Sequence, residues 1–125
     1  MILRQSKQLK ATENAEVSST NPIPQRLKEA RLKANLSQRT LGIMVGFDPA
    51  SASSRMNHYE KGRHLPDIDS LRRMAEKLNV PLNYFFCDDR LSAELAVVIS
   101  RLTEDERGRL LEVLKQATVD SKAEQ

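Results

Sequence analysis

The chain has 125 residues, of which 39% are hydrophobic, 30% are charged and only 4% are aromatic, with no tryptophan. This composition suits one small domain with arms and a core of Leu, Ala and Met, and it disfavours a β-rich fold, because strands favour β-branched and aromatic residues. Cys87 is the only cysteine, no apolar run is long enough to span a bilayer, and the first residues lack the apolar stretch of a secretory signal, so we expect a cytoplasmic protein without an intrachain disulfide.

The positive charge is concentrated in one part of the chain. The net charge of the whole protein is only +3, but residues 26–63 carry eight Lys and Arg against three Asp and Glu, a net charge of +5. From residue 91 onward, seven acids stand against five bases. A basic segment beside a slightly acidic one indicates a polyanionic partner or a solvated basic face, and charge alone does not separate these two interpretations.

The beginning of the chain changes from an irregular pattern to a helical one. Residues 1–21 are polar and show no sustained period, so we expect a flexible arm there. The Pro-Ile-Pro stretch at 22–24 then opens a helix that Asn35 ends, because proline is tolerated in a first turn. The inward positions of this helix are predicted to be Leu27, Ala30 and Ala34.

Residues 36–62 contain two short helical patterns with a break between them. Ser37 is a good N-cap for the first pattern, which stops at Gly46. Leu41 and Val45 form its core face, and Gly42 is small enough to let another helix approach closely.

Several residues compete as the start of the second helical pattern. Asp48-Pro49 is a helix-start signal, but Ser51 and Ser53 are competing N-caps, so the helix begins between residues 49 and 54 and ends at Gly62. Its inward face is predicted at Ala52, Met56 and Tyr59.

Helical patterns continue to the end of the chain, and no strand pattern interrupts them. Pro66-Asp67 opens one helix, residues 81–86 form a short apolar turn, and Thr103 with Glu106 makes a capping box for a last helix. Between the turn and the last helix, a seam typical of a helix that packs on another helix is formed by Leu91, Leu95, Val98 and Leu102.

The order of these features resembles the Cro/Xre-like, phage-repressor-type family of helix-turn-helix DNA-binding domains. The resemblance covers residues 25–86, about half of the chain. It rests on RLKEARLKANLSQ at 26–38, on Leu41, Val45 and Gly46, on Met56, Tyr59, Glu60 and Gly62, and on Pro66 and Asn79-Val80-Pro81 before Tyr84-Phe85-Phe86. It implies an all-α fold: a five-helix lambda-repressor-like DNA-binding domain with additional C-terminal helices. We expect an N-terminal arm over 1–21, the DNA-binding domain over 22–89, the C-terminal helices over 90–118 and a flexible tail over 119–125.

The resemblance also implies which residues meet DNA. It places the helix that ends near Tyr59 in the major groove, where arginine can pair with guanine and serine with either base type. Arg55 has an alternative role as a phosphate contact, and Ser53 and Ser54 an alternative role as N-caps. Carried over by position, the base-reading residues are Ser53, Ser54, Arg55 and His58, joined by Ser51 if the helix begins early. The phosphate-binding residues are Gln38, Arg39, Asn57, Lys61 and Arg63. Arg31 and Glu60 match a structural pair that ties the first helix to the third.

The chain departs from the family in the length of one connection. Most relatives have about four fewer residues between the positions of Gly46 and Tyr59, and four residues make about one helical turn. The extra residues either lengthen the recognition helix or widen the loop before it. We favour the wider loop, because Ser51 and Ser53 are good late caps.

The C-terminal leucines predict a partner. Two-fold symmetry suits a helix-turn-helix protein, because a dimer reads two half-sites about one DNA turn apart. We therefore expect a homodimeric, sequence-specific transcriptional repressor that binds double-stranded DNA and dimerises through Leu91, Leu95, Val98, Leu102, Leu110 and Leu114. The alternative is an antitoxin or bridging-type interaction module whose C-terminal helices bind another protein.

The sequence gives little support to other classes of function. There is no Gly-rich phosphate loop or nucleophile elbow, and His58 and His64 lack a second thiolate that would complete a zinc site. Asp88 and Asp89 disfavour the thiolate of Cys87. We expect no enzyme activity, no cofactor, no metal and no membrane contact, and the C-terminal segment shows no ligand-pocket pattern.

Overall fold

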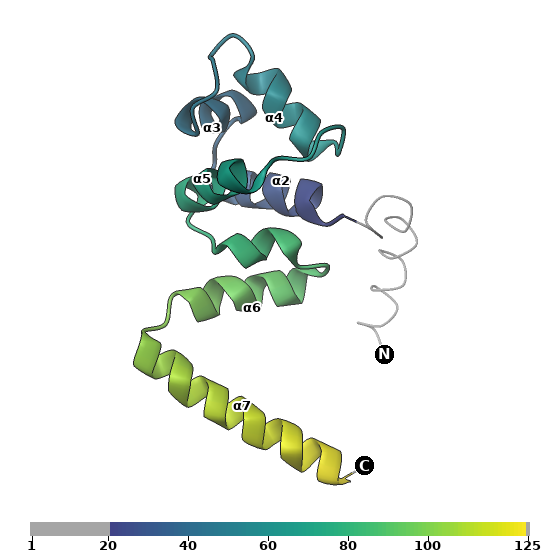
Figure 1. Ribbon diagram of the computed structural model, residues 1–125, viewed down its shortest axis with the longest axis vertical. Coiled ribbons are helices and arrows are strands. Elements are labelled where there is room, and N and C mark those ends of the chain that lie inside the picture. The colour runs from purple at the N-terminus through teal and green to yellow at the C-terminus, as the bar shows by residue number, and fades with distance from the viewer. Residues whose placement is uncertain (1–20, 125) are drawn as a thin grey trace.

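The computed structural model describes residues 21–124, and within this range the chain is helical and contains no strand. Its elements, in order, are α2 (Ile23–Lys33), α3 (Gln38–Met44), α4 (Ala52–Glu60), α5 (Ile68–Leu78), the 3₁₀ helix η1 (Leu82–Phe86), α6 (Arg90–Ser100) and α7 (Glu104–Glu124). Figure 1 shows α3 and α4 at one end of the molecule, α2 and α5 next to them, then α6, and α7 projecting away at the other end. The predicted all-α fold is confirmed, and the expected N-terminal arm lies outside the described residues except for Asn21.

Side-chain caps define where several helices begin. The Ser37 hydroxyl accepts a hydrogen bond from the Thr40 N–H at 3.0 Å, so the predicted N-cap of α3 is confirmed. The capping box of α7 is also confirmed, because Glu106 N–H donates to Thr103 Oγ1 at 3.1 Å and Thr103 N–H donates to Glu106 Oε1 at 2.8 Å. Asn35, with a φ of 58°, turns the chain in the left-handed region after α2.

The connection between α3 and α4 is a loop, as favoured from the sequence. Helix α4 begins at Ala52, with Ser51 at its N-cap position. The loop is held by a turn in which Ser51 N–H donates to the Asp48 carbonyl at 2.9 Å and Ala50 N–H donates to the Asp48 carboxylate at 3.0 Å. Its aromatic residue, Phe47, turns inward and is buried. The loop therefore has its own apolar anchor instead of adding a turn to α4.

The core lies between α2, α3, α4, α5 and η1. Leu27, Leu41, Met56 and Phe85 are fully buried, which agrees with the apolar positions predicted for their helices. Two predicted inward positions differ from this pattern. Ala34 is exposed because α2 ends at Lys33 and Ala34 is its C-cap, and Tyr59 is only half-buried because it lies at the edge of α4 beside Phe47.

Helices α3 and α4 pack closely at one glycine. A Cβ atom placed on Gly42 would lie 2.9 Å from both the Cβ and the carbonyl oxygen of Ala52. These are atoms of a small side chain and of the backbone, so neither can move aside without moving α4. The predicted close approach at Gly42 is confirmed, and it fixes the position of α4 against α3.

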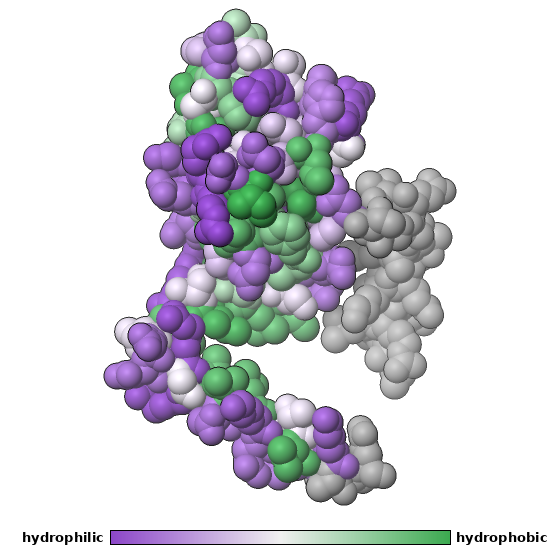
Figure 2. Space-filling model, viewed as in Figure 1, coloured by the Kyte–Doolittle hydropathy of each residue, from purple (hydrophilic) through white to green (hydrophobic). Residues whose placement is uncertain are grey.

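Helix α6 has two apolar sides, and only one of them is covered. Ala93 is buried against the core and Val97 packs beside it, while Leu91, Leu95 and Val98 on the opposite side are 67%, 52% and 58% exposed. Figure 2 shows apolar side chains gathered on the side of α6 that faces α7 and in patches along α7. Three of the four residues of the predicted seam therefore form an exposed apolar surface in this single chain, and the fourth, Leu102, is half-buried.

Helix α7 is exposed over residues 104–122. From Glu104 to Lys122, every side chain is exposed except the half-buried Leu110. The helix also continues to Glu124, through most of the segment 119–125 that the sequence placed in a flexible tail. A hydrogen bond of 3.1 Å from Gln116 to Asp120, one turn apart, supports this extension.

Candidate nucleic-acid interface

The outward face of α4 carries a short line of polar side chains. Ala52, Met56 and Glu60 are buried at i, i+4 and i+8, which defines the inward side of the helix. Ser54, His58 and Lys61 recur at i, i+4 and i+7 on the opposite side, where Ser54 and Lys61 are exposed and His58 is half-buried. Figure 1 shows α4 at the end of the molecule away from α7, so the C-terminal helices leave this side free.

A buried ion pair fixes α4 to α2. The Arg31 Nε and Nη2 atoms donate to the Glu60 carboxylate at 2.6 and 3.0 Å, and Arg31 Nη1 donates to the Leu36 carbonyl at 2.8 Å. Both residues are only 8% exposed. Such a two-pronged contact between a planar guanidinium and a carboxylate restricts both helices in angle as well as in distance. The structural role predicted for this pair is confirmed.

Gln38 extends the same network to α3. Its side-chain amide donates to Asn57 Oδ1 and to Glu60 Oε1, both at 3.1 Å. An amide nitrogen has two donor hydrogens, so both are used inside the protein. Gln38, predicted to bind phosphate, thus orients α4 through its side chain and keeps only its main-chain N–H for an outside ligand. Asn57 uses its oxygen in this network and retains its own NH₂ group.

Arg55 lies at the side of α4 and not at the centre of its outward face. Its guanidinium carbon is 3.9 Å from the centre of the Phe47 ring, a cation–π contact that holds the side chain toward the loop. Ser51, at the N-cap position, lies on the same side, and the exposed Ser53 lies on the other side. Of the residues predicted to read bases, Ser54 and His58 are therefore central, and Ser53 and Arg55 flank them.

The turn after α4 adds a residue that the sequence analysis did not assign to the site. Gly62 has a φ of 76°, and the N–H of Arg63 donates to the His58 carbonyl at 2.9 Å, so the chain folds back on the end of the helix. His64 thereby lies edge-on to His58, with ring centres 4.9 Å apart. Only the turn geometry brings these two rings together, and no spacing rule in the sequence predicts it.

Cationic side chains surround this surface. Arg39 at the start of α3, Lys61 at the end of α4 and Arg63 in the following turn are all exposed. None of the three forms an ion pair with a carboxylate in the part of the chain that the structure describes. Their charges are therefore available to a polyanion, whereas Arg31 is neutralised inside the fold.

Other kinds of site find no support among residues 21–124. No group of three or more His, Cys, Asp and Glu side chains comes together there as metal ligands would. Burial is the largest cause and raises the pKa of the Cys87 thiol, the charge of Arg26 lowers this pKa, and the smaller effects of the Asp89 and Asp88 charges raise it. Burial is thus the larger cause, where the sequence pointed to the aspartates alone. No helix in this range has the length and apolar character needed to cross a membrane.

Comparison with known proteins places this geometry in a family. A family profile described as a helix-turn-helix domain matches residues 25–87. The crystal structure of the transcriptional regulator BswR is similar, with a TM-score of 0.69 and 40% sequence identity over 75% of this chain and 93% of that one. No curated protein matches the chain. The profile covers the chain from Gln25 in α2 through η1, including the α3–α4 pair and the network that fixes it. The chain therefore belongs to the helix-turn-helix DNA-binding family of the Cro/Xre type.

Proposed function

We propose that this protein is a sequence-specific DNA-binding transcriptional regulator, a repressor, that places α4 in the major groove as a homodimer. The observation that carries this proposal is the outward line of Ser54, His58 and Lys61 on a helix whose other side is fixed by the core and by the Arg31–Glu60 pair. A reading helix has to be rigid and has to present polar groups, because sequence is read by hydrogen bonds to base edges. The similarity to a transcriptional regulator supports the part of this proposal that concerns regulation of transcription.

Within this function, the residues of α4 have different tasks. Ser54 and His58 are assigned to base edges, since a hydroxyl and an imidazole can both donate and accept hydrogen bonds. Ser53 and Arg55 reach bases at the two sides of the helix. Ser51, at the N-cap position, is the residue at the edge of the DNA-contacting surface. Because Arg55 is stacked on Phe47, it meets DNA in a fixed orientation, either at a guanine or at the neighbouring phosphate.

The phosphate contacts are assigned to residues around the helix. Arg39, Lys61 and Arg63 supply charge, Asn57 supplies its NH₂ group, and Gln38 supplies its main-chain N–H. These groups lie on α3, on α4 and in the following turn, so they approach the DNA backbone on either side of the inserted helix. This arrangement fixes the register of α4 in the groove without contributing sequence information.

The homodimer is assigned to the C-terminal helices. Leu91, Leu95 and Val98 expose an apolar surface on α6, and Leu114 on α7 is 50% exposed. Leu102, at the bend from α6 to α7, and Leu110, within α7, are both half-buried. A second copy that covers these side chains removes them from water, and two-fold symmetry then presents two α4 helices to two half-sites.

The proposal is tested by fluorescence anisotropy of the full chain with fragments of its own promoter and with random DNA, at several salt concentrations. Neutralising about 6 to 8 phosphates per dimer predicts a slope of log affinity against log salt of about −5 to −7. The promoter fragment should bind at least about a thousandfold more tightly than random DNA. Equal affinity for both would exclude sequence-specific regulation.

A second candidate function is an interaction module of the antitoxin or bridging type. The observation in its favour is α7, whose exposed apolar side chains Leu111, Val113, Leu114 and Val119 lie on a helix with almost no cover from its own chain. This candidate predicts a stable complex with a different protein and no DNA affinity in the anisotropy experiment. The regulator and the module are thus separated by the same measurement.

A further inference from the structure

A hollow of about 570 Å³ lies where the helix-turn-helix unit meets α6. Its lining comes from α2, from the end of α5, from the turn that follows and from α6. Apolar groups of Ala30, Leu78, Val80 and Val97 form most of its wall, together with the ring of Tyr84. Ligand sites in proteins have this size and this mainly apolar character, with a few polar groups that fix orientation.

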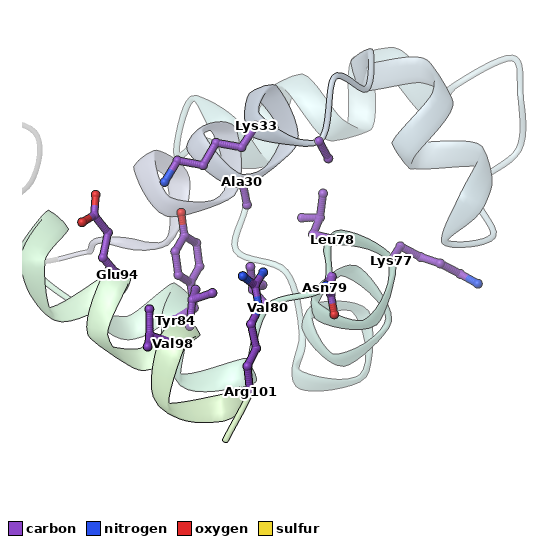
Figure 3. A pocket seen from close by; sticks show the side chains of 12 residues that line it. Ala30, Lys33, Lys77, Leu78, Asn79, Val80, Tyr84, Glu94, Val98 and Arg101 are labelled. Atoms are coloured by element: carbon purple, nitrogen blue, oxygen red, sulfur yellow. The ribbon is translucent and has the colours of Figure 1, made fainter. Parts of the chain in front are cut away.

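The charged residues of the hollow are mostly cationic. Lys33, Lys77 and Arg101 line it, against the single carboxylate of Glu94. Figure 3 shows Lys33 and Arg101 extending along the hollow from α2 and α6, while Lys77 points away from it. Lys77 lies 3.8 Å from Glu76, whereas Lys33 and Arg101 form no ion pair with any carboxylate that the structure describes. Two cationic side chains without an ion-pair partner among the described residues therefore lie beside an apolar wall.

The polar group at the floor of the hollow is already satisfied. The Tyr84 hydroxyl donates to Glu29 Oε2 at 3.1 Å, and burial raises the pKa of this phenol, so it remains protonated and presents an apolar ring to the hollow. Besides apolar contact with the wall, the lining offers the positive charges of Lys33 and Arg101, the carboxylate of Glu94 and the polar side chain of Asn79. An apolar ligand without a charge would leave these cations unused, and a cationic ligand would be repelled.

The geometry points to this hollow as a binding site for a small molecule with an apolar body and a carboxylate or similar anionic group. The apolar body lies against Val80, Val97 and Tyr84, and the anionic group meets Lys33 and Arg101. Such a ligand touches the helix-turn-helix unit and α6 at the same time. This inference concerns a site separate from the DNA surface, and the leucine spacing of the C-terminal segment gave no sign of it.

The test uses the full chain with ¹³C-labelled valine and leucine methyl groups, observed by NMR, and three probes that share an eight-carbon chain: octanoate, octanol and octylammonium. Octanoate should shift the methyl resonances of Leu78, Val80 and Val97 at a concentration at least about threefold lower than the other two probes require. Lys33→Ala and Arg101→Ala should each weaken octanoate binding by about three- to fivefold. Lys77→Ala, a matched removal of a lysine that points away, should leave it unchanged.

Several outcomes would overturn the inference. Equal binding of octanoate and octanol would show that the cations take no part. Shifts confined to Leu111, Val113 and Leu114 would place the probe on the exposed surface of α7. Equal loss in Lys33→Ala and Lys77→Ala would indicate a general charge effect and not a site. None of these readouts depends on DNA binding, so failure here is distinct from failure of the proposed regulator.

Discussion

The segment from α2 to η1 buries most of its apolar side chains, whereas helix α7 leaves most of its apolar side chains exposed. In α2 to η1, each α-helix buries one side in a shared core, and the buried Arg31 donates two hydrogen bonds to the buried Glu60 carboxylate. Arg26, also buried there, has no hydrogen-bond partner at Nε and Nη1 among the described residues. Helix α7 buries almost nothing, although leucine and valine side chains lie along it. The first region has a buried core of its own, and the second is stabilised by local features such as its capping box.

This difference indicates which region suits DNA reading and which suits binding of another polypeptide. A surface that reads DNA needs a rigid support, and the core and ion pair of the first region supply it. A surface that recruits another polypeptide needs exposed apolar area, and α6 and α7 supply that. The two surfaces lie at opposite ends of the molecule (Figure 1), so that both can be occupied together.

Removing a buried charge should give the largest difference in lost stability between the two regions. Glu60→Ala leaves the Arg31 guanidinium buried without a counter-charge, and we expect it to lower the free energy of unfolding by about 3 to 5 kcal/mol. The matched change in α7 is Glu112→Ala, which breaks an exposed contact of 3.7 Å with Lys115 and should cost less than about 1 kcal/mol. Chemical denaturation followed by circular dichroism measures both. Equal losses would show that the two regions are not supported differently.

The second prediction concerns the exposed apolar surface. Leu95→Glu places a charge on the open side of α6, and because the contact repeats by symmetry, we expect the dimer dissociation constant to rise about a hundredfold or more. Leu65→Glu is the control, since Leu65 is 66% exposed but lies outside the C-terminal helices. Sedimentation equilibrium gives the dimer fraction of each variant. Dissociation by Leu65→Glu, or none by Leu95→Glu, would move the dimer contact elsewhere.

The third prediction compares a glycine-to-alanine substitution in each region and expects changes in stability of opposite sign. Gly42→Ala brings a methyl group to within 2.9 Å of Ala52, so overpacking should destabilise the fold by about 1 to 3 kcal/mol. Gly108→Ala in α7 meets nothing within 4 Å, and alanine should favour the helix by up to about 1 kcal/mol. The midpoint of thermal unfolding tests both variants. For Gly108→Ala, the helix content at low temperature is measured as well. Stabilisation by Gly42→Ala would contradict the close packing of α3 on α4.

The smallest expected effect concerns the N-cap of α3. Ser37→Ala removes the acceptor for Thr40 N–H and should cost about 1 kcal/mol. Ser37→Asp, which keeps an acceptor, should restore most of this loss. Urea denaturation at constant salt measures the three proteins. No difference between serine and alanine would indicate that the core alone holds α3 in place.

Much of the fold could be predicted because its signals are local. Ser37, Thr103 with Glu106, and the buried spacing of Leu41, Met56 and Leu27 follow from capping and helical periodicity, which act within one or two turns. The position of Arg55 over Phe47, the contact of His58 with His64 and the use of the Gln38 amide inside the protein could not be predicted in the same way. These depend on how a loop or turn folds back, and on competition for hydrogen-bond partners between helices.

The central claim is that the outward line of α4 reads bases while the surrounding cations hold phosphates. The most direct measurement is the affinity of the full chain, His58→Ala and Lys61→Ala for the promoter site and for its single-base variants, each as a function of salt. We predict that His58→Ala reduces the discrimination at particular positions by about 1 to 3 kcal/mol with an unchanged salt slope. Lys61→Ala should weaken all sequences alike and make the slope shallower by about 2 per dimer. If both variants weaken every sequence equally and change the slope equally, α4 contacts only the backbone and the account is wrong.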